Sequence, residues 1–198
     1  MISLFSYKSR HFFDLLWGMT EKELKARYKH TVFGFLWVVV NPLLQMLVIG
    51  FIFRLFIKEP IYNYYYYLFS GLLVWNFFTL SLTKATPSIV YERSLIKKAK
   101  FPHSVIPLSI IIFNAINLVI AFGLLVVPTA AAKLITFGKL PIFFIGIALL
   151  LSFTTGMSLL TSALNVRFRD VNFFVQALLI VWFYATPIVY SISVVPYD

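Results

Sequence analysis

The sequence contains no cysteine, which excludes disulfides, thiolate metal sites and a catalytic thiol. Charged residues are scarce, at 12% of 198 residues, whereas about a quarter of an average soluble domain is charged. Hydrophobic residues make up 61% of the chain, and the mean hydropathy is +0.89. These proportions leave no room for a separate soluble domain and predict an all-α, polytopic membrane helix bundle.

Candidates for acid–base or metal chemistry are few. All seven Asp and Glu residues lie outside the long uncharged runs, and no two of the three histidines have metal-ligand spacing. An ionisable residue inside a membrane normally marks a proton or ion pathway, so this pattern argues against a proton- or sodium-driven carrier. We therefore expect no catalytic and no metal-binding residues, and a polytopic enzyme is the least favoured class.

The chain also lacks the nucleotide-binding loop GxxxxGK[ST], so it does not bind ATP by that route. We expect no cofactor in this chain, and any uphill transport must take its energy from a partner that binds ATP. The net charge of +10 varies strongly along the sequence. This distribution indicates membrane topology and gives no reason to expect a nucleic-acid partner.

Long hydrophobic runs are what the sequence has in abundance. Each of five uncharged runs exceeds the roughly 20 residues that cross about 30 Å of hydrocarbon. The runs are Thr31–Phe53, Pro60–Thr83, Phe101–Ala132, Leu140–Val166 and Val171–Tyr197. They predict five spans, over about residues 32–57, 62–83, 105–128, 140–166 and 171–191. The sequence ends directly after the fifth run without a returning helix, which predicts a truncated chain or a fragment.

Basic residues predict the orientation of these spans. Lysines and arginines before the first run, between the second and third, and between the fourth and fifth outnumber those on the opposite side, which are Arg54, Lys58, Lys133 and Lys139. The side richer in Lys and Arg is normally cytoplasmic. We therefore expect a multi-pass protein of the bacterial inner (plasma) membrane with a cytoplasmic N-terminus.

An amphipathic helix is predicted over residues 5–30, before the first run. Apolar residues such as Phe13 and Trp17 recur at helical spacing, while Lys22 and Lys25 lie on the opposite side. A helix with basic residues around an apolar stripe typically lies along the headgroups of an anionic leaflet. The segment is thus expected to be interfacial.

A second basic segment, residues 86–100, lies between the second and third spans. Thr86 and Pro87 are typical of an N-cap followed by proline in the first turn of a helix. Lys97 and Lys98 would close the last turn, where the helix dipole favours cations. The segment fits two interpretations, namely a helix that docks on a partner or a loop that only anchors the cytoplasmic side.

Neutral polar residues form stripes along the predicted spans. Asn41 and Gln45 lie four residues apart in the first span, Asn114 and Asn117 mark the third, and Thr154 begins a Ser/Thr stripe in the fourth. One interpretation is hydrogen bonding between helices, worth about 0.6 kcal/mol per bond in a membrane. The other is a hydrated path for a polar, uncharged substrate.

Aromatic residues are abundant, at 19% of the chain, and they cluster at the start of the second span. An aromatic belt at the outer membrane surface would explain most of them. Alternatively, some rings face inward and stack on the C–H groups of sugars. The candidate residues for such a glycan path are Tyr64, Tyr65, Tyr66, Tyr67, Trp75 and Asn76.

Four stretches resemble a known family in order and spacing. They are ELKARYKHTVFGFLWVVVNPLLQ (Glu23–Gln45), the basic segment with Phe101-Pro102 and Pro107, NVRFRDV (Asn165–Val171) and YATPIVY (Tyr184–Tyr190). Together they resemble the membrane subunits of type-2 ABC exporters of cell-surface polysaccharides, which include the O-antigen, capsule and teichoic acid exporters.

This resemblance implies a homodimer of six-helix subunits that pairs with two ATP-binding subunits and moves a lipid-linked polysaccharide. It also implies that the N-terminal helix contacts the ATPase and that aromatic side chains line the glycan path. A coupling helix near Ser88–Ala99 would rest in a cleft of the ATPase. Its candidate residues are Arg93, Ser94, Leu95, Ile96, Lys97 and Lys98. The chain departs from the family by ending before the sixth helix.

Two other classes remain compatible with the sequence. One is a drug- or lipid-exporting permease of the same superfamily, which neighbouring glycosyltransferase genes would disfavour. The other is a membrane scaffold without transport activity, which would not co-purify with an ATPase.

Overall fold

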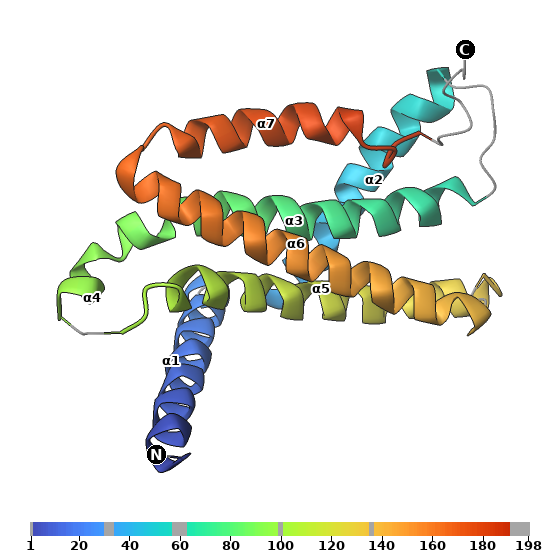
Figure 1. Ribbon diagram of the computed structural model, residues 1–198. Coiled ribbons are helices and arrows are strands. Elements are labelled where there is room, and N and C mark those ends of the chain that lie inside the picture. The colour runs from blue at the N-terminus through green and yellow to red at the C-terminus, as the bar shows by residue number, and fades with distance from the viewer. Residues whose placement is uncertain (1, 30–33, 57–62, 99–100, 135–136, 191–198) are drawn as a thin grey trace.

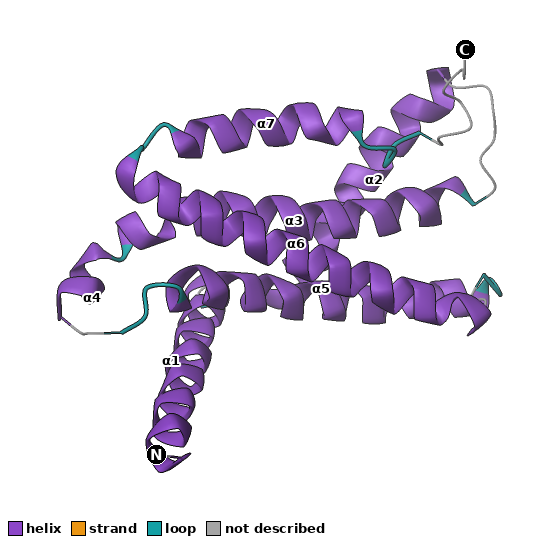
Figure 2. Ribbon diagram, in the orientation of Figure 1, coloured by secondary structure: helices purple, strands orange, loops and turns teal. Residues whose placement is uncertain are grey.

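The structure is a computed structural model that describes residues 2–29, 34–56, 63–98, 101–134 and 137–190. Within these ranges the regular elements are all helices (Figure 2). They are α1 (Ile2–Tyr28), α2 (Trp37–Phe56), α3 (Tyr64–Tyr91), α4 (Arg93–Lys98), α5 (Val105–Ala131), α6 (Leu140–Arg167) and α7 (Val171–Ala185), with short 3₁₀ turns before α2 and α6. The all-α prediction is confirmed.

Helix α3 is the centre of the bundle, where it packs against α2, α5, α6 and α7. Figure 1 shows α3, α5, α6 and α7 lying along a common direction, while α1 runs across them and contacts α5. The core of the α3–α5 contact consists of apolar residues that recur at helical spacing, among them Phe69, Leu73 and Phe77 of α3 and Ile111 and Leu118 of α5. The apolar faces of these two helices therefore position the rest of the chain.

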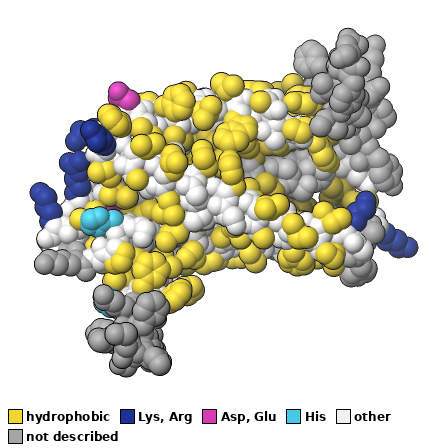
Figure 3. Space-filling model, in the orientation of Figure 1, with side chains coloured by type: hydrophobic (Ala, Val, Ile, Leu, Met, Phe, Trp, Pro, Cys, Tyr) yellow, Lys and Arg dark blue, Asp and Glu magenta, His cyan; other side chains and the backbone are white. Residues whose placement is uncertain are grey.

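Three described helices, α3, α5 and α6, are long and apolar enough to cross a membrane, and two further apolar helices, in α2 and α7, are shorter. Figure 3 shows Lys and Arg side chains at the two ends of the bundle, with hydrophobic side chains covering much of the face between them. This separation of charge from apolar surface is what a bilayer requires. The predicted membrane helix bundle is confirmed.

The contact between α3 and α6 is a seam of small polar residues. The Thr86 hydroxyl of α3 donates a hydrogen bond to Thr161 Oγ1 of α6 at 2.9 Å. Thr154, Ser158 and Ser162 of α6 are buried in the bundle as well. Because small side chains let membrane helices approach closely, the structure favours the packing interpretation for the polar stripe of α6.

The predicted start of the helix over residues 86–100 is wrong. Helix α3 continues through Thr86 and Pro87 to Tyr91, and α4 follows only after a break at Glu92. Thr86 bonds Thr161 and therefore does not act as an N-cap, and Pro87 lies buried inside the helix. Proline is tolerated there because neighbouring helices and side chains compensate for the lost backbone hydrogen bond. The second span accordingly extends beyond its predicted end at residue 83.

Helices α2 and α7 correspond to the first and fifth predicted spans. In the first predicted span, helix α2 begins at Trp37, after a turn in which Gly34 adopts a left-handed φ of 46°; the predicted limits at residues 32 and 57 lie outside the described ranges. The fifth span, expected to reach residue 191, ends as a helix at Ala185. Thr186 precedes Pro187 and is extended, with φ −94° and ψ 136°, because a following proline disfavours the helical conformation.

Candidate functional site

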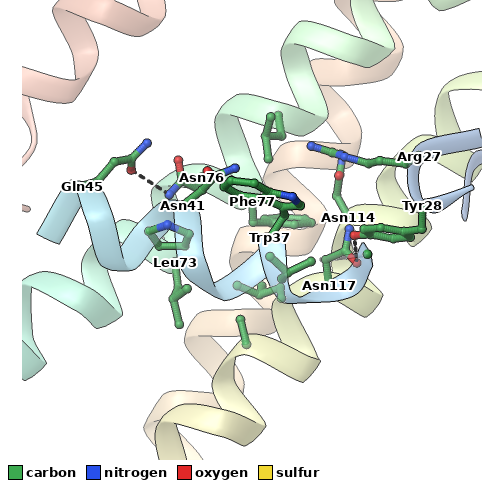
Figure 4. A pocket seen from close by; sticks show the side chains of 16 residues that line it. Arg27, Tyr28, Trp37, Asn41, Gln45, Leu73, Asn76, Phe77, Asn114 and Asn117 are labelled. Atoms are coloured by element: carbon green, nitrogen blue, oxygen red, sulfur yellow. Dashed lines mark hydrogen bonds between the residues drawn. The ribbon is translucent and has the colours of Figure 1, made fainter. Parts of the chain in front are cut away.

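A cavity of about 380 Å³ lies between the end of α1 and helices α2, α3 and α5. Its polar lining comes largely from carboxamide side chains, so we call it the amide cavity (Figure 4). The amides are Asn41, Gln45, Asn76, Asn114 and Asn117. Helices α2, α3 and α5 therefore all direct carboxamide groups toward the same cavity.

Hydrogen bonds pair these amides across helices. Asn76 Nδ2 on α3 donates to Gln45 Oε1 on α2 at 3.0 Å. Asn114 Nδ2 on α5 donates to Ser81 Oγ on α3 at 3.2 Å. Each of these bonds uses one end of an amide that has both a donor and an acceptor. The acceptor of Asn114 lies buried without a partner among the described residues.

The end of α1 closes the cavity on another side. The Tyr28 hydroxyl donates to Asn117 Oδ1 at 3.2 Å, which joins residues 89 positions apart. Burial raises the pKa of Tyr28 above its usual value of 10, although the charge of Arg27 and the Asn117 hydrogen bond both oppose this shift. Tyr28 therefore stays protonated near neutral pH and remains a hydrogen-bond donor.

Helix α1 is held in this position by contacts with α5. Thr20 is buried, and its hydroxyl lies 2.8 Å from the Leu16 carbonyl and 3.5 Å from the Ser109 carbonyl of α5. The Arg27 guanidinium lies over the Phe113 ring, 5.5 Å from its centroid. A buried hydroxyl and a cation–π contact thus fix the polar end of α1 beside the cavity.

Two aromatic side chains also line the amide cavity. Trp37 of α2 and Phe77 of α3 lie between the Gln45–Asn76 pair and the Tyr28–Asn117 pair (Figure 4). The cavity therefore combines apolar ring surface with neutral hydrogen-bonding groups. No carboxylate lines it, and no group of three His, Asp or Glu residues that could hold a metal ion occurs in the described part of the chain.

The predicted glycan-path tyrosines are not part of this cavity. The hydroxyl of Tyr64 donates to the Val189 carbonyl at 2.9 Å, and that of Tyr67 donates to the Pro187 carbonyl. Tyr65 packs against Gly50 of α2, where an added Cβ would come within 2.7 Å of the ring. These tyrosines therefore bind the segment after α7 or pack between helices.

The remaining candidates for the glycan path separate from one another. Tyr66 packs against the α3–α5 core. The Trp75 ring lies 5.7 Å from the Phe78 ring and 5.5 Å from the Phe183 ring, in an aromatic cluster between α3 and α7. Asn76 is the member of the predicted set that lines the amide cavity. The sequence did not predict that Arg27, Tyr28 and Trp37 line the amide cavity, because all three lie outside the predicted polar stripes.

Helix α4 carries the predicted coupling residues at one end of the bundle (Figure 1). Arg93, Ser94, Lys97 and Lys98 are exposed, whereas Leu95 and Ile96 are partly buried. No residue of α4 is fully buried. The helix therefore presents four polar side chains outward from the body of the bundle.

An ion pair joins this region to α1. Lys22 Nζ lies 2.6 Å from Glu92 Oε1 at the break between α3 and α4. The backbone N–H groups of Leu95 and Ile96 donate to the Glu92 carbonyl at 3.0 and 3.1 Å. The residue directly before α4, whose carbonyl accepts the first backbone hydrogen bonds of that helix, is thus also the residue held by α1.

Comparison with known proteins identifies the family. The ABC-2 type transporter family matches residues 14–197, which is nearly the whole chain. The chain belongs to the ABC-2 type transporter family. The permease is 38% identical to the O-antigen export system permease protein RfbA of Klebsiella pneumoniae, over 96% of its own length and 74% of that relative. It is 35% identical to the protein of the same name from Myxococcus xanthus, over 91% and 70% of the two chains. A second RfbA of Klebsiella pneumoniae is 37% identical, over 96% and 74%.

Family membership gives the helices a common role. The ABC-2 permease is a membrane-embedded transport subunit, and its apolar helices cross the bilayer several times. The predicted family is therefore confirmed. The individual roles of α4 and of the tyrosines remain predictions.

Proposed function

We propose that this permease is the transmembrane subunit of an ATP-driven exporter that moves a lipid-linked polysaccharide from the cytoplasm across the bacterial inner membrane. The observation that carries the proposal is the similarity of 35–38% over 91–96% of the chain to three permeases of O-antigen export systems. A neutral, amide-lined cavity within the bundle is compatible with a cargo that is rich in hydroxyl groups.

The energy comes from a separate ABC subunit that binds and hydrolyses ATP. The permease sequence lacks a nucleotide-binding loop of the GxxxxGK[ST] type. Helix α4 supports the contact, because Arg93, Ser94, Lys97 and Lys98 project outward and are available to a partner. The ion pair between Lys22 and Glu92 would pass a displacement of α4 on to α1.

A homodimer forms the transport unit. Helix α2 supports this arrangement, since a row of large apolar side chains on it is more than half exposed in the described part of the chain. These side chains are Leu44, Leu47, Val48, Phe51 and Leu55, each between 52% and 64% exposed. Lipid can cover such a face, but so can the same face of a second subunit, as a two-fold interface requires.

The N-terminus and α4 lie on the cytoplasmic side. Basic residues support this orientation, because Lys84, Arg93, Lys97, Lys98, Arg167 and Arg169 all belong to the segments around α4 and the α6–α7 turn. In Figure 1 these segments share one end of the bundle. The other end carries the loop with Lys133 and Lys139, and an excess of Lys and Arg marks the cytoplasmic face.

Depletion of the permease in its native host tests the export function. Lipid-linked polymer should accumulate in the cytoplasm while the cell surface loses its glycan, as measured by surface labelling of intact and lysed cells. A surface with normal glycan would refute the polysaccharide assignment and would favour a drug or lipid cargo.

Charge reversal on α4 tests the coupling role. Lys97→Glu combined with Lys98→Glu should leave ATP hydrolysis by the complex active but reduce export, because the contact that transmits the movement is lost. Lys133→Glu combined with Lys139→Glu, at the opposite end, is the matched control. Unchanged export in the α4 variant would show that these lysines only anchor the loop.

A further inference from the structure

We propose that the amide cavity binds a single neutral sugar unit of the glycan inside one permease subunit. This inference rests on the proposed function, because the glycan is the proposed cargo, and it adds a recognition site that lies within the subunit. The site is built from α1, α2, α3 and α5 of the same chain. A glycan would therefore be held by side chains of one subunit before or during its passage.

The unused ends of the amides fit sugar hydroxyls. The hydrogen bond from Asn76 to Gln45 uses neither the Asn76 acceptor nor the Gln45 donors. The hydrogen bond from Tyr28 likewise does not use the Asn117 donors. A hydroxyl group both donates and accepts. Neighbouring hydroxyls on a sugar ring can therefore bind the donor of one amide and the acceptor of the next.

Asn114 contributes a buried acceptor without a partner among the described residues to the wall of the cavity. This side chain is 3% exposed, and its Oδ1 has no hydrogen-bond partner among the described residues, while its Nδ2 is held by Ser81. Asn114 also lines the cavity. A buried acceptor without a partner is costly, and rotation of the Asn114 side chain toward the cavity would let it accept a hydrogen bond from a ligand hydroxyl.

The other walls disfavour a cationic ligand. None of the described residues that line the cavity is a carboxylate, so a cation finds no counter-charge among them. Among the described lining residues Arg27 is the charged side chain, and its guanidinium lies over the Phe113 ring. The aromatic residues Trp37 and Phe77 also line the cavity. Neutral amides together with aromatic faces match an uncharged, hydroxyl-rich ring.

The size of the cavity limits the ligand to a small unit. Its volume of about 380 Å³ lies near the lower end of the range for small-molecule sites, about 300–1,000 Å³. An extended polymer would exceed this space. We therefore infer that the occupant is one sugar unit of the glycan.

Photo-crosslinking locates the glycan in the intact exporter. A diazirine amino acid replaces Leu80, which lines the cavity, in the complete complex in living cells. The control position is Leu160 of α6, which is 55% exposed and does not belong to the lining. After illumination, a lectin-reactive adduct of the permease should form from position 80 and not from position 160. Equal labelling at both positions, or labelling from neither, would overturn the cavity site.

Binding measurements test the amide chemistry. The complete complex is reconstituted in nanodiscs, and the probe is lipid-linked glycan extracted from the host. Asn114→Leu should weaken binding at least tenfold. The matched control is Asn165→Leu on α6, because Asn165 is also 3% exposed with an Oδ1 that lacks a partner among the described residues. This control should bind the glycan like the wild type, as long as both variants keep the wild-type melting temperature.

A second variant covers the case in which Asn114→Leu fails to fold. Leu80→Phe reduces the free volume without removing an amide and should weaken binding of the same probe. Equal affinity of all variants would refute the cavity site while the depletion assay could still support export. Loss of binding on addition of excess phosphatidylglycerol would instead assign the cavity to a lipid headgroup and would equally refute the inference.

Discussion

Helix α3 presents neutral polar groups to two sets of neighbours, and the polar groups are packed differently in the two contacts. Toward α6 the groups are hydroxyls, and Thr86 bonds Thr161 directly across a closed seam. Toward α2 and α5 the groups are mainly amides, and a space of about 380 Å³ remains between the helices. The same kind of sequence pattern, a polar stripe on a membrane helix, thus gives two different structures.

The difference between the two contacts follows from the length of the side chains and from the number of hydrogen-bonding groups that each carries. The hydroxyls of Thr161 and Ser162 also reach carbonyls of their own helix, those of Ser158 and Leu159, at 3.3 and 3.0 Å. Such short side chains permit close approach of two helices. An amide is longer and has two ends, so one end can join a neighbouring helix while the other faces open space. Short hydroxyls therefore close an interface, whereas amides can frame a site.

The largest expected effect comes from a larger side chain in the seam. Ser158→Leu should lower the free energy of unfolding by about 1–3 kcal/mol, because the residue is fully buried and extra methyl groups force the two helices apart. The measurement is thermal unfolding of the purified permease in detergent. Ser158→Ala is the control and should cost little, since it removes a hydroxyl without a partner among the described residues. An equal loss in both variants would contradict the closed seam.

Removal of the hydrogen bond between Thr86 and Thr161 should have a smaller effect. Thr86→Val keeps the shape but loses this 2.9 Å bond, which is worth about 0.6–1.7 kcal/mol between membrane helices. The same unfolding assay measures it. Thr129→Val serves as the control, because the Thr129 hydroxyl bonds carbonyls of its own helix. A Thr86 variant as stable as this control would show that the bond contributes nothing to the seam.

Smaller still is the energy that couples Gln45 and Asn76 at the amide cavity. A double-mutant cycle with Gln45→Leu and Asn76→Leu isolates the interaction of their side chains. We expect a coupling of about 0.6 kcal/mol, the average for such bonds in a membrane protein. A coupling above that of the Thr86–Thr161 pair would reverse the comparison and make the cavity edge the stronger contact.

The smallest effect is expected at Tyr28. Tyr28→Phe removes one 3.2 Å hydrogen bond and should cost about 0.5 kcal/mol. Because burial raises the pKa of Tyr28 above 10, its contribution to stability is present below pH 10 and is lost as the pH rises through the raised pKa. The difference in stability between wild type and variant should be constant from about pH 7 to 9 and shrink above pH 10. A difference that shrinks below pH 9 would contradict the raised pKa.

Much of the helical architecture can be predicted from the uncharged runs. The third and fourth spans, predicted over 105–128 and 140–166, correspond closely to α5 (Val105–Ala131) and α6 (Leu140–Arg167). Hydrophobicity marks the part of a helix that lies in the membrane and does not mark where its backbone hydrogen bonds end. Helix α3 therefore continues past Lys84, where the uncharged run ends, to Tyr91. The end of α7 was predictable in principle, since Thr186 precedes a proline.

The amide cavity was only partly predictable. The sequence shows Asn41 with Gln45 and Asn114 with Asn117 as polar pairs on separate spans. It does not show which helices face each other, because that depends on contacts between residues far apart in the chain. The contribution of Tyr28 depends on the docking of α1 across α5, which no local pattern in either helix encodes.

The short helix α7 has a consequence for the lipid around the permease. Its 15 residues extend about 22 Å at 1.5 Å per residue, which is less than the hydrocarbon thickness of about 30 Å. The carbonyls of Pro187, Val189 and Tyr190 follow it and accept hydrogen bonds from Tyr64 and Tyr67, so these three groups are satisfied without water. A short apolar length draws the adjoining leaflet inward. Beside α7 the bilayer would be thinner than elsewhere, and a polar chain leaving at that position would have less hydrocarbon to cross.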